Sequence, residues 1–159
     1  MVIAAECQGS PAPGTSTSTV VRKDGAYALR FTGDRLGFLL WMGDTVQALV
    51  AKKTDWTAGQ WYHVAATYDG RLMRIFIDGK EAAGSPRRQT GLIDVSVNNC
   101  GVGAYGGGGR FHGLIDEARV PLVIAGAIVS GAPLPEPVTM FGAIGAVVAS
   151  AGYLRRRLA

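Results

Sequence analysis

Two acidic residues, Asp116 and Glu117, are the first candidates for catalysis, because glycoside hydrolases act through a pair of carboxylates. They are neighbours in Phe111 to Val120, a stretch that reads as a strand, and successive side chains of a strand point to opposite faces. We therefore expect that they do not flank one bond together. Distant carboxylates such as Asp44 and Asp94 remain an alternative, since residues far apart in the chain can converge in a fold.

Histidine and cysteine chemistry is not indicated either. His63 and His112 belong to no nucleophile motif and have no second histidine at metal-ligand spacing, so we expect both on sheet faces. Cys7 and Cys100 are far apart and neither is part of a C-x-x-C pair, which argues against zinc and redox sites. The sequence thus predicts no catalytic residues and no enzyme.

Aromatic side chains are the better candidates for binding, because sugar rings stack on aromatic faces. Trp56 and Tyr105 lie in or beside predicted loops, where binding residues of sandwich folds concentrate, and we predict that these two contact a ligand. Trp41, Trp61 and Tyr62 are further aromatic candidates.

The stretch from Trp61 to Lys80 sets the architecture that must position these residues. Apolar residues alternate in both of its halves, which is the period of a strand. Asp69-Gly70 and Asp78-Gly79 follow the two halves, and Asp-Gly accepts the positive φ angles of a tight turn. Three successive antiparallel strands are therefore predicted, with further strands at 27–31, 36–42, 45–51, 92–97, 101–105 and 111–120.

The motifs W-Y-H-V-A-A-T-Y-D-G, I-F-I-D-G-K, G-V-G-A-Y and F-H-G-L-I-D-E-A-R-V, in this order, resemble the LamG-like jelly-roll domain of the concanavalin A-like lectin/glucanase fold. The resemblance covers roughly Thr19 to Val120 and implies an all-β, antiparallel two-sheet sandwich that binds glycans or protein surfaces. It places Trp61 inside the sandwich. The Glu-x-Asp-x-x-Glu type of signature found in the glucanase relatives does not occur in this chain.

The resemblance also implies features that the residues do not settle. Relatives often hold a structural calcium ion near the closing strand, which would make Asp116 a metal ligand; the alternative is that Asp116 and Glu117 pair within the sheet edge. Many relatives carry a disulfide, here Cys7 with Cys100, and the alternative is two unrelated thiols. The family normally has strands before Val20, so we expect a domain truncated at its start.

Four segments follow from these patterns. Residues 1–19, which include the stretch Q-G-S-P-A-P-G-T-S-T-S-T, are predicted to be loop or irregular chain. The sandwich is expected at residues 20–120. A linker of small residues follows at 121–133, and residues 134–159 form a separate tail.

The tail combines Pro135-Glu136-Pro137, the uncharged apolar run Val138 to Leu154, and the basic cluster Arg155, Arg156 and Arg157. At about 1.5 Å per residue the run is long enough for a short transmembrane helix, and the arginines favour a cytoplasmic end. This arrangement resembles the PEP-CTERM sorting signal of Gram-negative bacteria, which an exosortase processes. The alternatives are a plain membrane anchor and a buried helix.

The distribution of charge along the chain argues against one class of partner, nucleic acid. The formal charge of +4 comes mostly from the three tail arginines, and a nearly neutral body offers no footprint for nucleic acid. We expect a non-enzymatic module at the cell surface or secreted from a Gram-negative cell, sorted through its tail, which binds a glycan or matrix polysaccharide. The alternatives are a structural or adhesive matrix protein that contacts other proteins, and a glycoside hydrolase.

Overall fold

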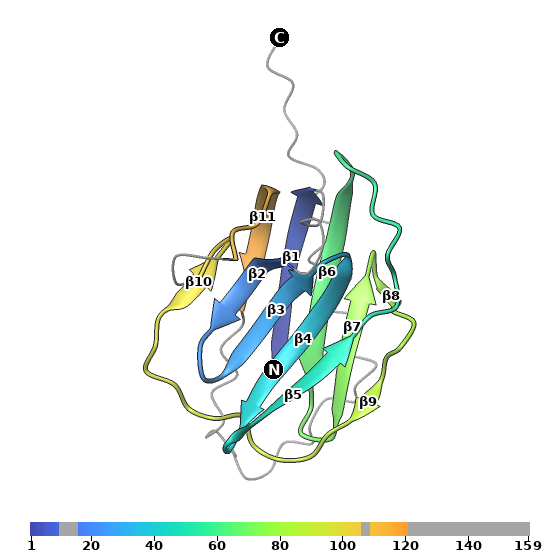
Figure 1. Cartoon of the computed structure of the whole chain (residues 1–159). Helices are drawn as coiled ribbons and strands as arrows, with labels where there is room; N and C mark the ends of the chain where they lie inside the picture. The colour runs from blue at the N-terminus through green and yellow to red at the C-terminus, as the bar shows by residue number, and fades with distance from the viewer. Residues whose placement is uncertain (10–15, 106–108, 121–159) are drawn as a thin grey trace, which may run out of the picture. The chain divides into compact units, whose positions relative to one another are not determined.

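A computed structural model describes residues 1–9, 16–105 and 109–120 (Figure 1). The secondary structure in these residues consists of strands, without a helix. The strands are β1 (Val2–Gly9), β2 (Thr17–Lys23), β3 (Tyr27–Thr32), β4 (Arg35–Met42), β5 (Thr45–Val50), β6 (Trp61–Tyr68), β7 (Leu72–Ile77), β8 (Lys80–Glu81), β9 (Arg87–Arg88), β10 (Cys100–Val102) and β11 (Gly113–Arg119).

The strands form two antiparallel sheets that pack face to face, which confirms the predicted all-β sandwich. A six-stranded sheet has the order β11-β1-β6-β7-β8, with β9 also paired to β7. The other sheet has five strands in the order β10-β2-β3-β4-β5. In Figure 1 the meander β2 to β5 lies across β1, β6 and β7 of the larger sheet.

The paired strands β6 and β7, and the Asp78-Gly79 turn between β7 and β8, agree with the pattern of the sequence. Tyr62, Val64, Ala66 and Tyr68 of β6 are all buried, and so are Met73, Ile75 and Ile77 of β7. Asp78 and Gly79 have φ angles of 50° and 76°, as a two-residue hairpin turn requires. These side chains form one core with those of the facing sheet, where Leu29, Phe31, Leu36, Phe38 and Leu40 are buried.

The N-terminal segment differs from the expectation, because residues 1–19 are not irregular throughout. β1 lies in the larger sheet between β11 and β6, and Ile3, Ala5 and Cys7 alternate into the core. These buried residues carry a period of two that is easily overlooked, since alanine and cysteine are small. A strand therefore does precede Val20, contrary to the expectation of missing early strands.

The predicted strand at residues 92–97 is also absent. The segment is not a strand, although the N–H of Asp94 donates to the carbonyl of Trp41 in β4 at 2.8 Å. Asp94 and Ser96 are half-buried. The Asp94 carboxylate accepts the N–H of the β4–β5 turn at 2.7 Å, and the Ser96 hydroxyl donates to the carbonyl of Asp24. Val95 and Val97 are each 98% exposed. Apolar and polar residues do alternate in this segment, but the polar side chains face the protein because they form hydrogen bonds to two turns, and the valines therefore face solvent.

Several predictions concern residues 121–159, which lie outside the described residues. These are the linker and the sorting signal, with Pro135, Glu136, Pro137, the apolar run 138–154 and Arg155, Arg156 and Arg157. In the described part of the chain, no helix has the length and apolar character needed to cross a bilayer.

Candidate functional site

An arginine on the outer face of the five-stranded sheet lies between two aromatic rings. The guanidinium carbon of Arg22 is 4.5 Å from the ring centroid of Tyr105 and 5.4 Å from that of Trp41. Both distances allow cation–π attraction. Arg22, Trp41 and Tyr105 are each half-buried, so a ligand in solution can reach them. We call these three residues, together with Asp24 and Arg30, the arginine cluster.

Small neighbours on the adjoining strands allow Arg22 to lie across the sheet. Arg22 of β2 pairs with Ala28 of β3 on one side and with Gly101 of β10 on the other. Ala28 in turn pairs with Leu39, which is two residues from Trp41 on the same face of β4. Because neither pairing partner has a long side chain, the guanidinium reaches the rings on both sides.

Gly101 also determines where Tyr105 lies. A Cβ atom at Gly101 would be 2.5 Å from the carbonyl oxygen of Ala104, closer than real Cβ atoms approach. The missing side chain therefore lets the chain fold back tightly after β10, and this turn carries the Tyr105 ring toward Arg22.

Asp24 is the acidic partner of Arg22 in this cluster. Its Oδ1 is 2.5 Å from Nη2 of Arg22. The hydrogen bond from Arg22, then its charge and a hydrogen bond from Tyr105, lower the pKa of Asp24, although desolvation opposes them. Asp24 is thus held ionised at neutral pH and fixes one edge of the Arg22 guanidinium.

Arg30 of β3 adds a second positive charge. It pairs with Thr19 of β2, which puts it diagonally next to Arg22 on the same face. Burial, and then the charge of Arg22, lower the pKa of Arg30. The Nε atoms of Arg22 and Arg30 are both buried, and neither has a hydrogen-bond partner among the described residues.

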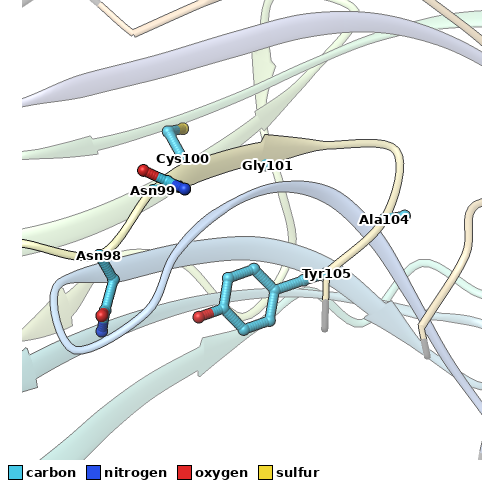
Figure 2. A pocket seen from close by; sticks show the side chains of 6 residues that line it. All are labelled: Asn98, Asn99, Cys100, Gly101, Ala104 and Tyr105. Carbon is cyan, nitrogen blue, oxygen red and sulfur yellow. The ribbon is translucent and has the colours of Figure 1, made fainter. Parts of the chain in front are cut away.

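A hollow of about 430 Å³ adjoins Tyr105 (Figure 2). Its other lining residues are Asn98, Asn99, Cys100, Gly101 and Ala104. In Figure 2 the Tyr105 ring extends toward the side of Asn98, with its hydroxyl leading. Side-chain amides next to an aromatic ring offer donors, acceptors and an apolar surface to one ligand.

Of the two predicted binding residues, Tyr105 belongs to this site and Trp56 does not. Trp56 lies in the chain between β5 and β6, where its ring meets Phe31 and Tyr62 edge to face, each at 4.9 Å between centroids. Its Nε1 donates to the carbonyl of Asp34 at 2.7 Å. These contacts give Trp56 a structural role at the margin of the core.

Trp61 is not a core residue, contrary to the expectation. Burial alternates along β6, and Tyr62 occupies the inward position while Trp61 is half-buried on the outer side. The two aromatic residues are adjacent, so a one-residue difference in register exchanges their roles. The sequence analysis did not identify Arg22 and Arg30 as site residues. The available signal was that each arginine occupies an outward position next to buried apolar residues of its own strand.

Asp116, the predicted calcium ligand, makes local contacts on the closing strand, and calcium binding there stays a prediction. Oδ1 of Asp116 accepts the N–H of Glu117 at 2.8 Å, and Glu117 forms an ion pair with Arg119. The described residues contain no group of three His, Cys, Asp or Glu side chains placed to hold a metal ion. Glu117, with φ of 50°, lies at a register shift between β1 and β11, so regular alternation is interrupted beside Asp116.

Both cysteines are free thiols, so the structure does not show the predicted disulfide. Cys7 points from β1 into the core, and burial, followed by the charges of Asp78 and Glu6, raises its pKa to about 12. Cys100 is exposed on β10 of the other sheet, where its sulfur is 3.8 Å from the Tyr27 hydroxyl.

A family model for the concanavalin A-like lectin/glucanases superfamily matches residues 7–121. The chain belongs to this superfamily. The match begins within β1 and ends after β11, so strands of both sheets belong to the concanavalin A-like domain.

Curated relatives of the domain match over a short segment. Pappalysin-1 of Mus musculus is 41% identical over 54 residues, which are 34% of this chain and 3% of the relative. Pappalysin-1 of Homo sapiens is 35% identical over 54 residues, with the same coverage of 34% and 3%. The chain therefore spans a small part of these proteins.

Solved structures share the fold of the concanavalin A-like domain. A Bacteroides ovatus ATCC 8483 protein, described as a candidate carbohydrate-binding protein, has a TM-score of 0.55 and 24% identity, covering 74% of this chain and 36% of its own. The LG4-5 domains of the mouse laminin alpha1 chain have a TM-score of 0.56 and 16% identity, covering 74% and 34%. The receptor-binding domain of a botulinum neurotoxin C/D mosaic has a TM-score of 0.55 and 10% identity, covering 74% and 31%.

Proposed function

We propose that this chain is a non-enzymatic glycan-binding module and that the arginine cluster, with the adjoining hollow, is its binding site. The observation that carries the proposal is the pair of accessible rings, Trp41 and Tyr105, held by Arg22 beside a hollow lined by Asn98 and Asn99. Aromatic surface together with a few convergent polar groups is the usual composition of a small-molecule site.

The likeness to laminin G and carbohydrate-binding folds supports a binding role, although the same superfamily includes glucanases. Three of the four carboxylates considered for catalysis have a local task in this chain. Asp116 accepts a backbone N–H, Glu117 pairs with Arg119, and Asp94 holds the β4–β5 turn. Because hydrolysis needs two carboxyl groups that face each other across a substrate, these assignments favour binding without cleavage.

The proposed setting is the outside of a Gram-negative cell. Its support is the order of the tail motifs, Pro135-Glu136-Pro137 before the apolar run 138–154 and Arg155–Arg157 after it. In this proposal the run inserts as a transmembrane helix, an exosortase processes the tail, and the sandwich remains at the cell surface or is secreted.

A second candidate function is adhesion to other matrix proteins. It is favoured by the exposed apolar side chains of Leu92, Val95 and Val97, which are 89%, 98% and 98% exposed. Exposed apolar groups that gather in one segment are typical of protein contacts.

A glycan array with the full chain tests the proposed function. We expect retention on at least one glycan class, and at least about a tenfold loss of affinity for Tyr105→Ala and for Trp41→Ala, corresponding to about 1.4 kcal/mol. Trp61→Ala is the matched control, because Trp61 is a half-buried aromatic residue on the outer side of the other sheet. The control should bind as the wild type does.

Two results would contradict the proposal. Equal losses in all three variants would show that the arginine cluster is not the site. New reducing ends after incubation with the bound glycan would show that the protein is a hydrolase.

A further inference from the structure

The arginine cluster has more positive than negative charge. Arg22 and Arg30 lie on adjacent strands of one sheet face, and Asp24 bonds Arg22 through one oxygen. Arg30 forms no ion pair with a carboxylate among the described residues. By contrast, Arg74 on the larger sheet has a bidentate contact with Glu81, with N–O distances of 2.9 and 3.2 Å.

The nitrogen atoms nearest the sheet are the ones left without partners. Nε of Arg22 and Nε of Arg30 are buried, and no polar atom of the described residues meets either of them. A buried donor without an acceptor is costly, and a charged acceptor compensates best. The two Nε–H groups face the sheet and are not accessible to a ligand, but both side chains are only half-buried, so the outer ends of the two guanidinium groups remain accessible to the oxygens of an anion.

The surroundings of Arg30 leave room for such an anion. On β4 its pairing partner is Gly37, and a Cβ atom built there would have no neighbour closer than 3.6 Å. The absence of a side chain at Gly37 is thus not required by packing, and it leaves one side of Arg30 uncovered. On the other side of Arg22, Tyr105 leads to the hollow with its two asparagines.

We propose that the ligand of this site is an acidic glycan, and that Arg22 and Arg30 together bind a carboxylate or sulfate group of one sugar while Trp41 and Tyr105 contact its apolar faces. This inference rests on the proposed function and specifies its ligand class. The shared chemistry is an anionic group with at least two oxygens, as either a uronate or a sulfate ester supplies.

The test measures binding of the full chain to polygalacturonate, dextran sulfate and uncharged dextran at two salt concentrations. The first two probes separate carboxylate from sulfate, and the third is the neutral reference. We expect at least one acidic polymer to bind more than tenfold tighter than dextran, with affinity falling as salt is added. Arg30→Gln should lower that affinity about tenfold.

The matched control is Arg74→Gln, which removes the same charge from an arginine that already has a partner. It should leave the affinity within about twofold of wild type, and thermal unfolding checks that both variants fold. Equal losses of affinity in Arg30→Gln and Arg74→Gln would show that only the net charge of the protein matters, and would overturn the inference.

The remaining outcomes separate the two proposals. Binding of a neutral glycan that depends on Tyr105, without preference for acidic polymers, would overturn the acidic ligand and leave the glycan site intact. Absence of binding to any glycan on the array or to any of the three polymers would overturn both.

Discussion

Two clusters in this sandwich contain the same components, a cation next to two aromatic rings, yet they differ in what remains free. Lys53 Nζ is 5.1 Å from the Trp56 ring centroid and 5.3 Å from that of Tyr62. Arg22 has the equivalent relation to Trp41 and Tyr105. Both pairs of rings would satisfy a search for aromatic binding residues.

The hydrogen bonds distinguish them. Around Trp56 every polar group described above has a partner: its indole N–H bonds Asp34, and Lys53 bonds the carboxylate of Asp55 at 2.9 Å. In the arginine cluster two guanidinium Nε atoms remain without partners among the described residues. Arg30 is half-buried and has no carboxylate partner among the described residues, whereas Lys53 has one. The comparison teaches that a cation without an acidic partner, more than aromatic residues in loops, marks a surface that is suited to an anionic ligand.

The largest expected effect is on stability at the first cluster. Trp56→Ala should lower the free energy of unfolding by about 3 kcal/mol, the low end for removal of a large aromatic side chain, because Phe31 and Tyr62 lose their ring contacts. Urea unfolding measures it. Tyr105→Ala should cost less than about 1 kcal/mol in the same measurement, and equal costs would remove the distinction between the clusters.

An intermediate effect is expected at Gly101, which positions Tyr105. Gly101→Ala forces a Cβ atom against the Ala104 carbonyl, so the turn must shift; we expect a cost of about 1–3 kcal/mol and weaker glycan binding, measured by unfolding and by titration. Gly37→Ala is the control for the unfolding measurement alone, since its added Cβ has only ordinary contacts while it lies beside Arg30 of the proposed site. Full binding by Gly101→Ala would show that the tight turn does not matter for the site.

The smallest expected effect concerns Asp24. Its folded pKa is depressed, so its contribution to stability is present above the unfolded pKa near about 4 and is lost as pH falls through the lower folded value. For a partly exposed ion pair this should be below about 1 kcal/mol. Unfolding of wild type and Asp24→Asn at pH 7 and pH 3 measures it, and a stability difference that grows toward pH 3 would contradict the assignment.

Much of the fold was predictable because its signals are local. The alternation in β6 and β7 and the Asp78-Gly79 turn depend on neighbouring residues, and all agree with the structure. The predicted strand at residues 92–97 was wrong, because alternation of apolar and polar residues does not reveal which side faces the protein. In the structure Asp94 accepts the N–H of Gly43, and Ser96 donates to the carbonyl of Asp24. Both partners are far from residues 92–97 in the sequence, so no local pattern shows these contacts.

The site was less predictable because it depends on register between strands. Tyr105 was identified from its position beside a loop, but its partner Arg22 comes from a strand far away in the chain. That pairing requires β10 to lie beside β2, and it requires small residues at Ala28 and Gly101 opposite the arginine. No local pattern contains this information.

The position of β1 has a consequence for the order in which the chain folds as it leaves the ribosome. β2 to β5 are successive neighbours and need only short loops to pair. In contrast, Val2 pairs with Thr67 on β6, and Gln8 pairs with Leu114 on β11, so β1 must wait until β6 and β11 have been made. Because such distant pairings form slowly, the larger sheet should limit the folding rate while the smaller meander can already be in place.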